Sequence, residues 1–353
     1  MDKVLKVGII GTGWISNQHV TGYIKSGKAE IIAVSDIKED AANSIIQKYG
    51  LSCKYYKDYK ELLANEEIEA VSICAPNRYH SEITVAAANA GKHIMAEKPF
   101  VSSPEEAIRS YKAIRDNGIK CAVGYHRRFN PLYQEMKRLR DKGDLGRLFF
   151  AQSDYIHNFS DMPIISWALK KEFNPSVFHA GGGHCVDIIR YLMNDEITEC
   201  AAFVDNSTCP ECETEAQTLA IYRFKNGQIG KVMAICPNVI TPFTFNLELY
   251  GTKGTFKNNQ LILDHFPDFR SQKAQNAYAT YPDWMPDNTP GVTEPWDIEI
   301  MEFVDWVLSG KEETELCSAK DAIRVAEACW AAVISNKENR IVKLPMIDLD
   351  AIE

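Results

Sequence analysis

The sequence feature that most constrains the fold is a glycine-rich turn near the start of the chain. An apolar run over residues 7–10 predicts a buried strand, and an amphipathic run from 15 to about 26 predicts a helix. Between them, Gly11 and Gly13 permit a tight turn that aims helix N–H groups at an anion. Dinucleotide pyrophosphate is the usual anion when this turn joins the first strand and helix of a doubly wound sheet. Ser16 stands where the third small residue of the fingerprint is expected, so the match is incomplete.

Asp36 is a second sign of a dinucleotide site. It ends the next apolar run, over residues 31–35, and lies 20 residues after Ser16. A carboxylate in this place accepts a hydrogen bond from a ribose 2′-hydroxyl, and it repels a 2′-phosphate, which favours NAD over NADP. Asp residues also favour the position just before a helix, so a capping role is the alternative interpretation.

The length and charge of the chain limit the class of protein. Its 353 residues exceed the usual size of one hydrophobic core, which predicts two domains. Hydrophobic residues at 45% and charged residues at 25% are typical of globular proteins. The net charge of -9 argues against nucleic acid or an anionic membrane as the main partner. No apolar run approaches the ~20 residues of a membrane span, and the first residues do not resemble a signal peptide, so we expect a cytoplasmic protein.

The ten cysteines are scattered along the chain. Several, including Cys74, Cys121 and Cys329, lie in apolar segments, which predicts reduced thiols in the core. Cys209 and Cys212 have the C-x-x-C spacing of a metal or redox pair, but no second pair or nearby histidine completes a four-ligand site. We therefore expect a surface turn there and no bound metal.

Strand and helix signals alternate over the first 125 residues. A buried strand over 70–75 stops at Pro76, and a further strand over 92–96 runs into Glu97 and Lys98. Buried apolar strands that alternate with amphipathic helices are typical of parallel sheets. Residues 1–125 are therefore predicted to form an α/β Rossmann-type domain with a doubly wound parallel sheet that binds a dinucleotide.

The pattern changes after residue 125. From 199 to 264, apolar and polar residues mostly alternate, and Asn226-Gly227 is typical of a two-residue hairpin turn. Strands joined by hairpins predict an α+β domain over residues 126–353, with a large open, mainly antiparallel sheet. A proline-bearing stretch from Phe266 to Pro295 lacks clear periodicity and is a candidate lid or subunit contact.

Several motifs occur in an order and spacing that resemble a known family. They are Gly11-Thr12-Gly13-Trp14-Ile15-Ser16, Ala75-Pro76-Asn77 with His80, Glu97-Lys98-Pro99, Ala180-Gly181-Gly182-Gly183-His184-Cys185-Val186-Asp187, and Tyr250-Gly251-Thr252-Lys253-Gly254-Thr255. Over nearly the whole chain, the sequence resembles the Gfo/Idh/MocA oxidoreductases, which include glucose-fructose oxidoreductase and inositol dehydrogenases. The resemblance implies NAD as cofactor, and it implies cofactor contacts from Gly11, Thr12, Gly13, Trp14, Ile15, Asp36, Ala75, Pro76, Asn77, His80, Glu97 and Lys98.

Lys98 follows the fifth predicted strand, at the sheet edge where open α/β sheets place their ligands. A lysine beside a bound nicotinamide stabilises a substrate alkoxide by charge and hydrogen bonding as hydride leaves carbon. From its position alone, a solvated loop lysine anchored by Glu97 is the alternative. The resemblance implies the catalytic role, because the family's lysine at this position is catalytic. Pro99 is compatible with a cis peptide bond that fixes the Lys98 side chain.

His184 and Asp187 lie three residues apart near the start of a helix predicted over 186–192, so both side chains face one side. A neutral histidine accepts the hydroxyl proton of an alcohol, and three preceding glycines permit close approach to a ligand. The resemblance implies that His184 is the general base, with Asp187 orienting it or binding a substrate hydroxyl. The alternative is a helix cap and a surface pair. Many family members carry an acid four residues before this histidine. Here the position is Ala180, so Asp187, another group or a route through Lys98 must replace that acid.

Ser153, Tyr155 and His157 alternate along the first strand of the second domain and so share one face. The resemblance implies that this strand lines the substrate pocket, which makes Tyr155 and His157 candidates for binding substrate hydroxyls. A solvent-facing side of the strand is the alternative. Trp167 is a candidate for stacking on a sugar ring, although tryptophan is more often a core residue.

These expectations describe an NAD-dependent dehydrogenase acting on CH–OH groups. It would transfer a hydride between nicotinamide and a secondary hydroxyl of a sugar, glycoside, sugar acid or cyclic polyol. Two alternatives stay open, namely a glycoside-cleaving enzyme that works through transient oxidation and a non-catalytic NAD-binding sensor. We expect a homo-oligomer, a dimer or tetramer, formed through the open sheet of the second domain.

Overall fold

The structure is a computed structural model that describes residues 3–160, 169–174, 176–237, 239–257, 260–264, 279–280 and 294–352. The chain folds into two compact units. The first comprises Met1–Phe129, Thr293–Ala326 and Ile347–Glu353, and the second comprises Asn130–Val292 and Glu327–Met346. Within the described residues, no helix combines the length and the apolar character needed to span a membrane.

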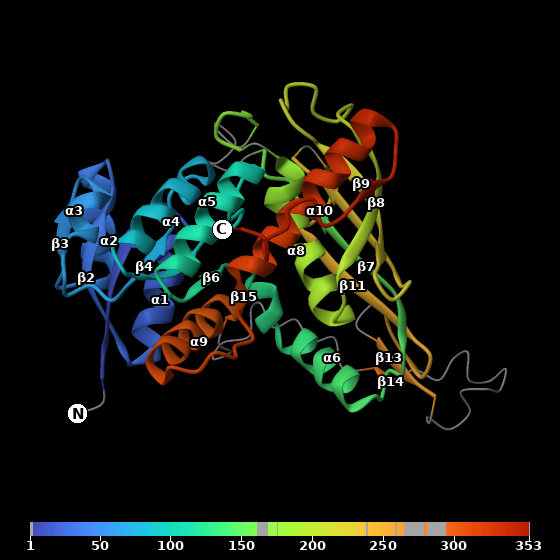
Figure 1. The fold of residues 1–353 in the computed structure, drawn as a ribbon, viewed down its shortest axis with the longest axis horizontal. Coiled ribbons are helices and arrows are strands. Elements are labelled where there is room, and N and C mark those ends of the chain that lie inside the picture. The colour runs from blue at the N-terminus through green and yellow to red at the C-terminus, as the bar shows by residue number, and fades with distance from the viewer. Residues whose placement is uncertain are drawn as a thin grey trace. The chain divides into compact units, whose positions relative to one another are not determined.

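The first unit is built on a seven-stranded sheet with helices packed around it (Figure 1). Its elements are β1 Leu5–Ile10, α1 Ser16–Ser26, β2 Ala29–Ser35, α2 Glu39–Tyr49, β3 Lys54–Tyr56, α3 Tyr59–Leu63, β4 Ala70–Ile73, η1 Asn77–Tyr79, α4 His80–Asn89, β5 His93–Ala96, α5 Pro104–Asp116, β6 Cys121–Val123, η2 His126–Phe129, α9 Pro295–Ser309, β15 Cys317–Ser318 and the first part of α10 Ala319–Glu338.

The strands of this sheet have the order β15-β6-β5-β4-β1-β2-β3, and all neighbours are parallel except β15 with β6. Apart from β15, this is the Rossmann order 3-2-1-4-5-6, which confirms the predicted doubly wound sheet. The direction of winding reverses between β1 and β4. Ligands of such sheets bind beyond the carboxyl ends of the strands at this reversal.

Helix α9 belongs to the first unit, although it lies more than 160 residues beyond the expected boundary at 125/126. It packs beside α1, where a Cβ added to Gly22 would lie 2.5 Å from Cβ of Ile300. Lys25 Nζ lies 2.6 Å from Asp297 Oδ2, and this aspartate is buried. The units are therefore discontinuous in sequence and differ from the expected continuous ranges, because a long-range helix pair joins the C-terminal part to the first sheet.

The second unit contains a nine-stranded sheet with helices on one face (Figure 1). Its elements are α6 Pro131–Lys142, β7 Leu148–Ile156, α8 Val177–Met193, β8 Ile197–Asp205, β9 Gln217–Phe224, β10 Ile229–Ile235, β11 Thr244–Gly251, β12 Gly254–Lys257, β13 Gln260–Leu263, β14 Ala279–Thr280, the last part of α10 and β16 Val342–Lys343. The strand order is β14-β13-β12-β11-β7-β10-β9-β8-β16. Among the described strands of this second sheet, β10 with β7 is the one parallel pair. This confirms the predicted open, mainly antiparallel sheet. The predicted hairpin joins β9 to β10, with Gly227 at φ 84°.

Helix α8 begins nine residues before the helix predicted over 186–192. Ser176 caps it by accepting a hydrogen bond from the His179 N–H at 3.0 Å. Gly181 and Gly182 lie inside this helix, where neighbouring side chains leave no room for a Cβ. A Cβ at Gly181 would lie 2.7 Å from the Tyr155 ring, and one at Gly182 would lie 2.6 Å from Phe178. Glycine is used here because α8 approaches β7 closely, a tertiary reason that helix propensity does not contain.

The turn at Cys209 and Cys212 is present, but the expected exposure of these residues is wrong. Cys212 N–H donates to Cys209 O at 3.0 Å, and both side chains are buried against Phe159, Val177 and Cys236. Burial raises the pKa of the Cys209 thiol to about 11. All ten cysteines, each within the described part of the chain, are present as thiols. Among the described residues, no group of three or more His, Cys, Asp or Glu side chains is arranged to hold a metal ion.

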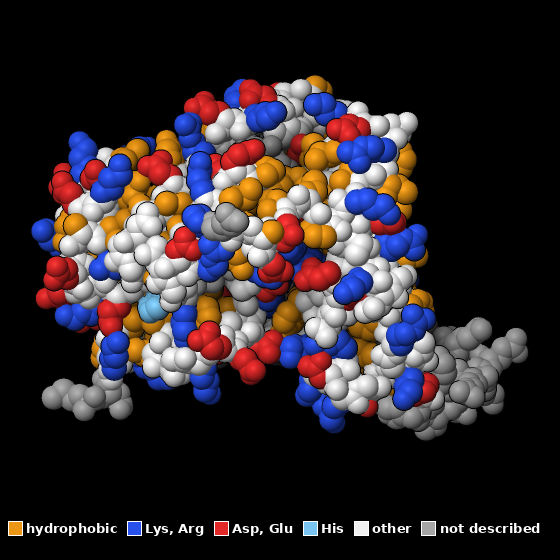
Figure 2. Space-filling view, viewed as in Figure 1, with side chains coloured by type: hydrophobic (Ala, Val, Ile, Leu, Met, Phe, Trp, Pro, Cys, Tyr) orange, Lys and Arg blue, Asp and Glu red, His pale blue; other side chains and the backbone are white. Residues whose placement is uncertain are grey.

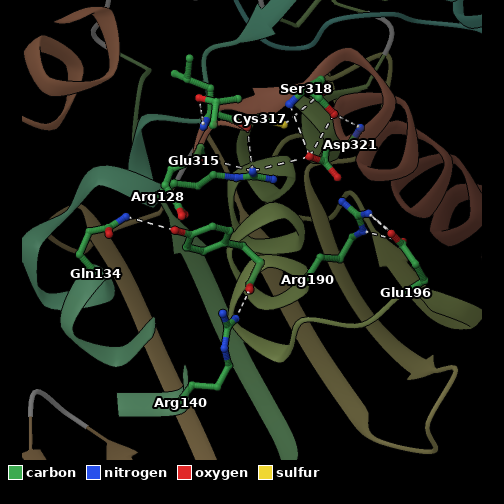
Figure 3. A network of polar contacts seen from close by, with 12 residues as sticks. Arg128, Gln134, Arg140, Arg190, Glu196, Glu315, Cys317, Ser318 and Asp321 are labelled. Carbon is green, nitrogen blue, oxygen red and sulfur yellow. Dashed lines mark hydrogen bonds and ion pairs between the residues drawn. The ribbon is translucent and has the colours of Figure 1, made fainter. Parts of the chain in front are cut away.

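Arginines fix the ends of several elements in each unit (Figure 3). In the first unit, buried Arg128 donates from Nη1 to Leu316 O at 3.3 Å and lies 3.7 Å from Asp321 Oδ2, and so ties η2 to the residues around β15. In the second unit, Arg140 donates to Tyr191 O at 2.6 Å and so ties α6 to α8. On the face shown in Figure 2, basic side chains are interspersed with acidic ones, so the excess acidic charge is spread out there.

Candidate active site

Gly11 and Gly13 are glycines for different physical reasons. Gly11 has φ 89°, and a Cβ added to it would lie 2.7 Å from Cys74 C and Ala75 N. The backbone just after the adjacent strand β4 therefore leaves no room for a side chain at position 11. A Cβ added to Gly13 would meet no protein atom within 4 Å. Packing therefore does not require glycine at 13, and close approach of a phosphate to the turn and the N-terminus of α1 stays the predicted reason for it.

This difference predicts opposite effects for two single substitutions. We expect Gly11→Ala to lower the free energy of unfolding by at least about 2 kcal/mol, because it combines a positive φ with a backbone clash. Gly13→Ala should leave the free energy of unfolding within about 1 kcal/mol of the original while weakening NADH binding at least tenfold. Denaturant unfolding and NADH fluorescence titration measure the two effects. Equal stability loss in both variants would contradict this assignment.

Asp36 holds the glycine turn from the end of β2. Its Oδ2 accepts hydrogen bonds from both the N–H and the hydroxyl of Thr12, each at 2.8 Å. Its Oδ1 accepts from Lys38 N–H at 2.8 Å, just before α2. The N-cap residue of α2 is Lys38, and no side chain caps the helix there, so the structure does not bear out the capping alternative for Asp36. The Asp36 carboxylate presents negative charge beside the glycine turn, and its contact with a ribose stays a prediction.

Ser16 fits the incomplete fingerprint without loss of packing. It is fully buried at the start of α1, and its hydroxyl donates to Gly13 O at 2.6 Å. This bond closes the turn on itself. Ile15 lies at the N-cap position of α1 and is half-buried, whereas the Trp14 side chain is 64% exposed. An aromatic ring thus projects from the turn into solvent.

The loops after β4 and β5 are tied together by His80. Its Nδ1 lies 2.7 Å from Pro99 O, and its Nε2 lies 2.7 Å from Ala75 O. The ring is buried, and burial lowers the pKa of His80. Pro76 and Asn77 begin the short helical turn η1 between Ala75 and His80. The structure thus gives His80 a bracing role between two loops at the sheet edge, and its contact with the cofactor stays a prediction.

Lys98 lies directly after β5 and is half-buried, and its peptide bond to Pro99 is cis, as expected. Its backbone N–H donates to Glu97 Oε2 at 3.2 Å. Burial lowers the pKa of the Lys98 ammonium, and the charge of Glu97 opposes this effect. Lys98 therefore gives up its proton at a lower pH than an ordinary surface lysine.

His126 and Trp296 extend this part of the first unit, and sequence reasoning assigned neither to the site. The His126 ring lies 4.1 Å from the Trp296 ring at 30°, and Trp296 meets Trp14 edge-on at 6.2 Å. His126 is buried, and burial together with the charges of Arg127 and Lys98 lowers its pKa well below the ordinary value. His126 directly follows β6, at the same strand ends as Lys98, so the strand-end rule is the signal that points to it.

The second unit brings four predicted residues to one helix and one strand. His184 and Asp187 are both buried on α8, so the expected alternative of a surface pair is wrong. Tyr155 and His157 are half-buried at the end of β7, with 3.0 Å between Tyr155 OH and His157 Nδ1. The Tyr155 ring contacts Gly181, one turn before His184. Helical side chains lean toward the preceding turn, so His184 leans toward the turn that Tyr155 covers.

Ala180 also lies in α8, one turn before His184, so an acid at this position would lie beside the imidazole. Tyr155 and Asp187 are the polar residues that β7 and α8 supply around this turn. Trp167 lies outside the described residues, as does the stretch from Phe266 to Pro295 apart from 279–280 and 294–295. The substrate role of Trp167 and the lid role of that stretch stay predictions.

Two family models match the chain. Residues 5–125 match the oxidoreductase family with an NAD-binding Rossmann fold, and residues 133–257 match the GFO/IDH/MocA C-terminal domain. Together they cover more than half of the chain. The chain belongs to the Gfo/Idh/MocA oxidoreductase family. Its first unit is the family's NAD-binding domain, which confirms the expected cofactor.

Members of the Gfo/Idh/MocA family with known names resemble the chain over most of its length. The scyllo-inositol 2-dehydrogenase (NAD(+)) of Bacillus subtilis is 27% identical over 356 residues, with 98% of this chain and 97% of the relative covered. The inositol 2-dehydrogenase of Salmonella typhimurium is 24% identical over 308 residues, with 87% of each covered. A solved levoglucosan dehydrogenase in complex with NADH and levoglucosan has a TM-score of 0.84 at 24% identity, and 98% of this chain and 100% of that chain are covered. Both named relatives are dehydrogenases, which confirms the expected class of enzyme.

Proposed function

We propose that this Gfo/Idh/MocA protein transfers a hydride between NAD and a secondary hydroxyl of a sugar, glycoside, sugar acid or cyclic polyol. The observation that carries the proposal is that Gly13, Asp36 and Lys98 follow the carboxyl ends of β1, β2 and β5, three strands of one parallel sheet. Bound NAD supplies the hydride acceptor or donor at nicotinamide C4. The names of the inositol and levoglucosan dehydrogenases support a hydroxyl-rich, ring-shaped substrate.

Lys98 would stabilise the substrate oxygen as negative charge develops on it. Its half-buried position strengthens this electrostatic effect, because water competes less with the ammonium there than at the surface. Glu97 fixes the backbone at Lys98 through the hydrogen bond at 3.2 Å. The remaining cofactor residues predicted from the family, Trp14 and Asn77 among them, are proposed to line the dinucleotide beside this group.

His184 would accept the hydroxyl proton of the substrate, with Asp187 as its support on the same helix. Their burial favours such a role, because a buried imidazole and carboxylate lose solvent competition for their hydrogen bonds. Tyr155 and His157 already share a polar contact at the end of β7, and we assign them to substrate hydroxyls. Polar side chains that alternate on one strand face suit several hydroxyls of one ring.

A screen of sugars, glycosides, sugar acids and cyclic polyols tests the proposal. Formation of NADH with at least one of them, and much weaker use of NADP because of Asp36, is the expected result. Release of an aglycone without net NADH would instead select cleavage through transient oxidation. NADH binding without turnover of any compound would select a sensor.

The open face of the second sheet suggests an oligomer. On β8, β9 and β10, one set of alternating side chains is buried beneath the helices, as shown by Tyr222 OH donating to Ala328 O of α10 at 3.2 Å. The opposite face exposes apolar side chains, with Phe203 74% and Ile221 49% exposed. Exposed apolar faces of this kind mark interaction surfaces. We propose that two or four copies pair through it, and that the enzyme works in the cytoplasm, where its thiols stay reduced.

Replacement of Ile221 by glutamate should therefore lower the molar mass of the assembly. Light scattering measures the mass, and Glu66→Gln on the surface of the first unit is the control. The buried partners of β9 are untouched, so the unfolding midpoint of the separated subunit should change little. A monomeric wild-type protein at all concentrations would contradict the proposed pairing.

A further inference from the structure

His19 is a fully buried histidine of α1 that the proposed reaction does not use. Its Nδ1 lies 2.9 Å from Ser72 Oγ in β4, and its Nε2 lies 3.1 Å from Glu97 Oε1 after β5. The ring therefore joins three elements of the first unit. One of its partners is the residue whose other carboxylate oxygen accepts the Lys98 N–H.

Glu97 has little room to move. A Cβ added to Gly124 would lie 2.9 Å from Glu97 Oε1 and 3.3 Å from Oε2, so the backbone after β6 walls the carboxylate on one side. His19 lies against Oε1, and the Lys98 N–H binds Oε2. The Glu97 carboxylate is therefore held in place by the imidazole of His19, the backbone N–H of Lys98 and the backbone at Gly124.

The far side of His19 is anchored as well. Tyr23 OH lies 2.8 Å from Ser72 Oγ, and burial raises the pKa of this phenol, which keeps it protonated. Burial alone lowers the pKa of His19, but Cys74 and Glu97 outweigh it and raise the pKa to about 10. The raised pKa favours the charged form of the His19 ring, in which Nε2–H donates to the Glu97 carboxylate.

We infer that His19 is a positioning residue for Lys98, because it holds the Glu97 carboxylate in place against the Lys98 backbone. This inference rests on the proposed function of Lys98. Without the His19 contact, Glu97 Oε1 loses its partner and the carboxylate shifts away from Lys98, which weakens the charge that opposes the effect of burial on the Lys98 pKa. The Lys98 ammonium then loses its proton at a lower pH.

The charged and titratable groups around His19, Glu97 and Lys98 lie on several elements. His19 faces Tyr23, Cys74 and Glu97. The charge of Glu97 also raises the pKa of His80, and the charge of Lys98 lowers the pKa of both His80 and His126. His80 and His126 have lowered pKa values and are neutral at neutral pH, so Glu97 is the group whose charge opposes the effect of burial on Lys98.

The test measures the titration of Lys98 in the cofactor-free protein by NMR of isotope-labelled lysine Cε. The Lys98 signal is assigned by its absence in Lys98→Arg. We expect His19→Leu and Glu97→Gln to lower the pKa of Lys98 alike, by roughly one pH unit. His19→Gln keeps a hydrogen-bond donor without its charge, so its Lys98 pKa should fall between those of wild type and His19→Leu. Gly124→Ala displaces the same carboxylate without touching His19, so it provides a second route to the same change.

His93→Leu is the matched control, because it removes a partly buried histidine of the neighbouring strand β5 whose Nδ1 accepts from Lys120 N–H at 3.0 Å. It should leave Lys98 unchanged. In turnover, His19→Leu should lower kcat by about 10- to 100-fold with little change in NADH affinity, and the alkaline limb of kcat should move to lower pH. An unchanged or raised pKa of Lys98 in folded His19→Leu and Gly124→Ala overturns the inference. Absence of any NAD-linked turnover in wild type would reject the proposed function alone.

Discussion

Replacing Lys98 with alanine is expected to lower kcat by about 10²- to 10³-fold, the usual effect of losing one preorganised group that stabilises developing negative charge. NADH affinity should stay nearly the same, because in the proposed function the glycine turn and Asp36 hold the dinucleotide independently of the ammonium. Stopped-flow single turnovers separate the chemical step from release of NADH. A purely structural lysine would instead change the unfolding midpoint and leave kcat intact.

Arginine at position 98 provides the matched control, because it keeps a positive charge that does not titrate in the accessible range. The ammonium form of Lys98 is the active form in the proposed mechanism. Since burial lowers the pKa of Lys98, wild-type kcat should fall as pH rises through that lowered value. In Lys98→Arg this alkaline limb should disappear while part of the activity remains. An identical alkaline limb in both proteins would assign the titration to another group.

Replacing His184 with alanine is expected to lower kcat by about 10²- to 10⁴-fold, the range for loss of a general base. Hydroxide can take the proton in its place, so log kcat of the variant should rise steadily with pH. Added imidazole should restore part of the rate in the cavity left on α8.

Asp187→Asn is the comparison for His184. It keeps the size of the side chain in a fully buried position but removes its charge, so a supporting role predicts a smaller loss than His184→Ala. An equal loss of kcat in both variants would indicate that His184 and Asp187 act as one catalytic unit. Full activity in His184→Ala would remove the histidine from the proposed chemistry.

Local sequence signals predicted the first sheet well. Its strands are continuous apolar runs because parallel strands are covered on both faces, and such runs stand out in sequence. Helix α5 begins at a local capping signal, with Ser103 Oγ accepting from Glu106 N–H at 3.3 Å and Pro104 at the first position. Spacing alone predicted Gly11 and Asp36 at the ends of two strands, because a strand, a turn and a helix are contiguous in the chain.

Features that depend on contacts distant in sequence could not be predicted in the same way. The three glycines of α8 predicted close approach to a ligand, and the structure shows a packing reason for two of them, because Gly181 faces the ring of Tyr155 on β7 and Gly182 faces Phe178. The membership of α9 in the first unit rests on its contact with α1, 270 or more residues apart at Lys25 and Asp297. His19 meets Glu97 across 78 residues, so no local pattern marks it. Local patterns predicted the residues at strand ends and the pair His184 and Asp187 on α8, whereas the supporting residues came from packing.

The most direct test of the account uses a substrate from the screen that carries deuterium at the carbon to be oxidised. Incubation with NAD should give NADH that carries this deuterium at nicotinamide C4, in amounts equal to the ketone formed, and the yield should collapse in Lys98→Ala and His184→Ala. Ketone formation without deuterium in NADH, or undiminished transfer in both variants, would contradict the account.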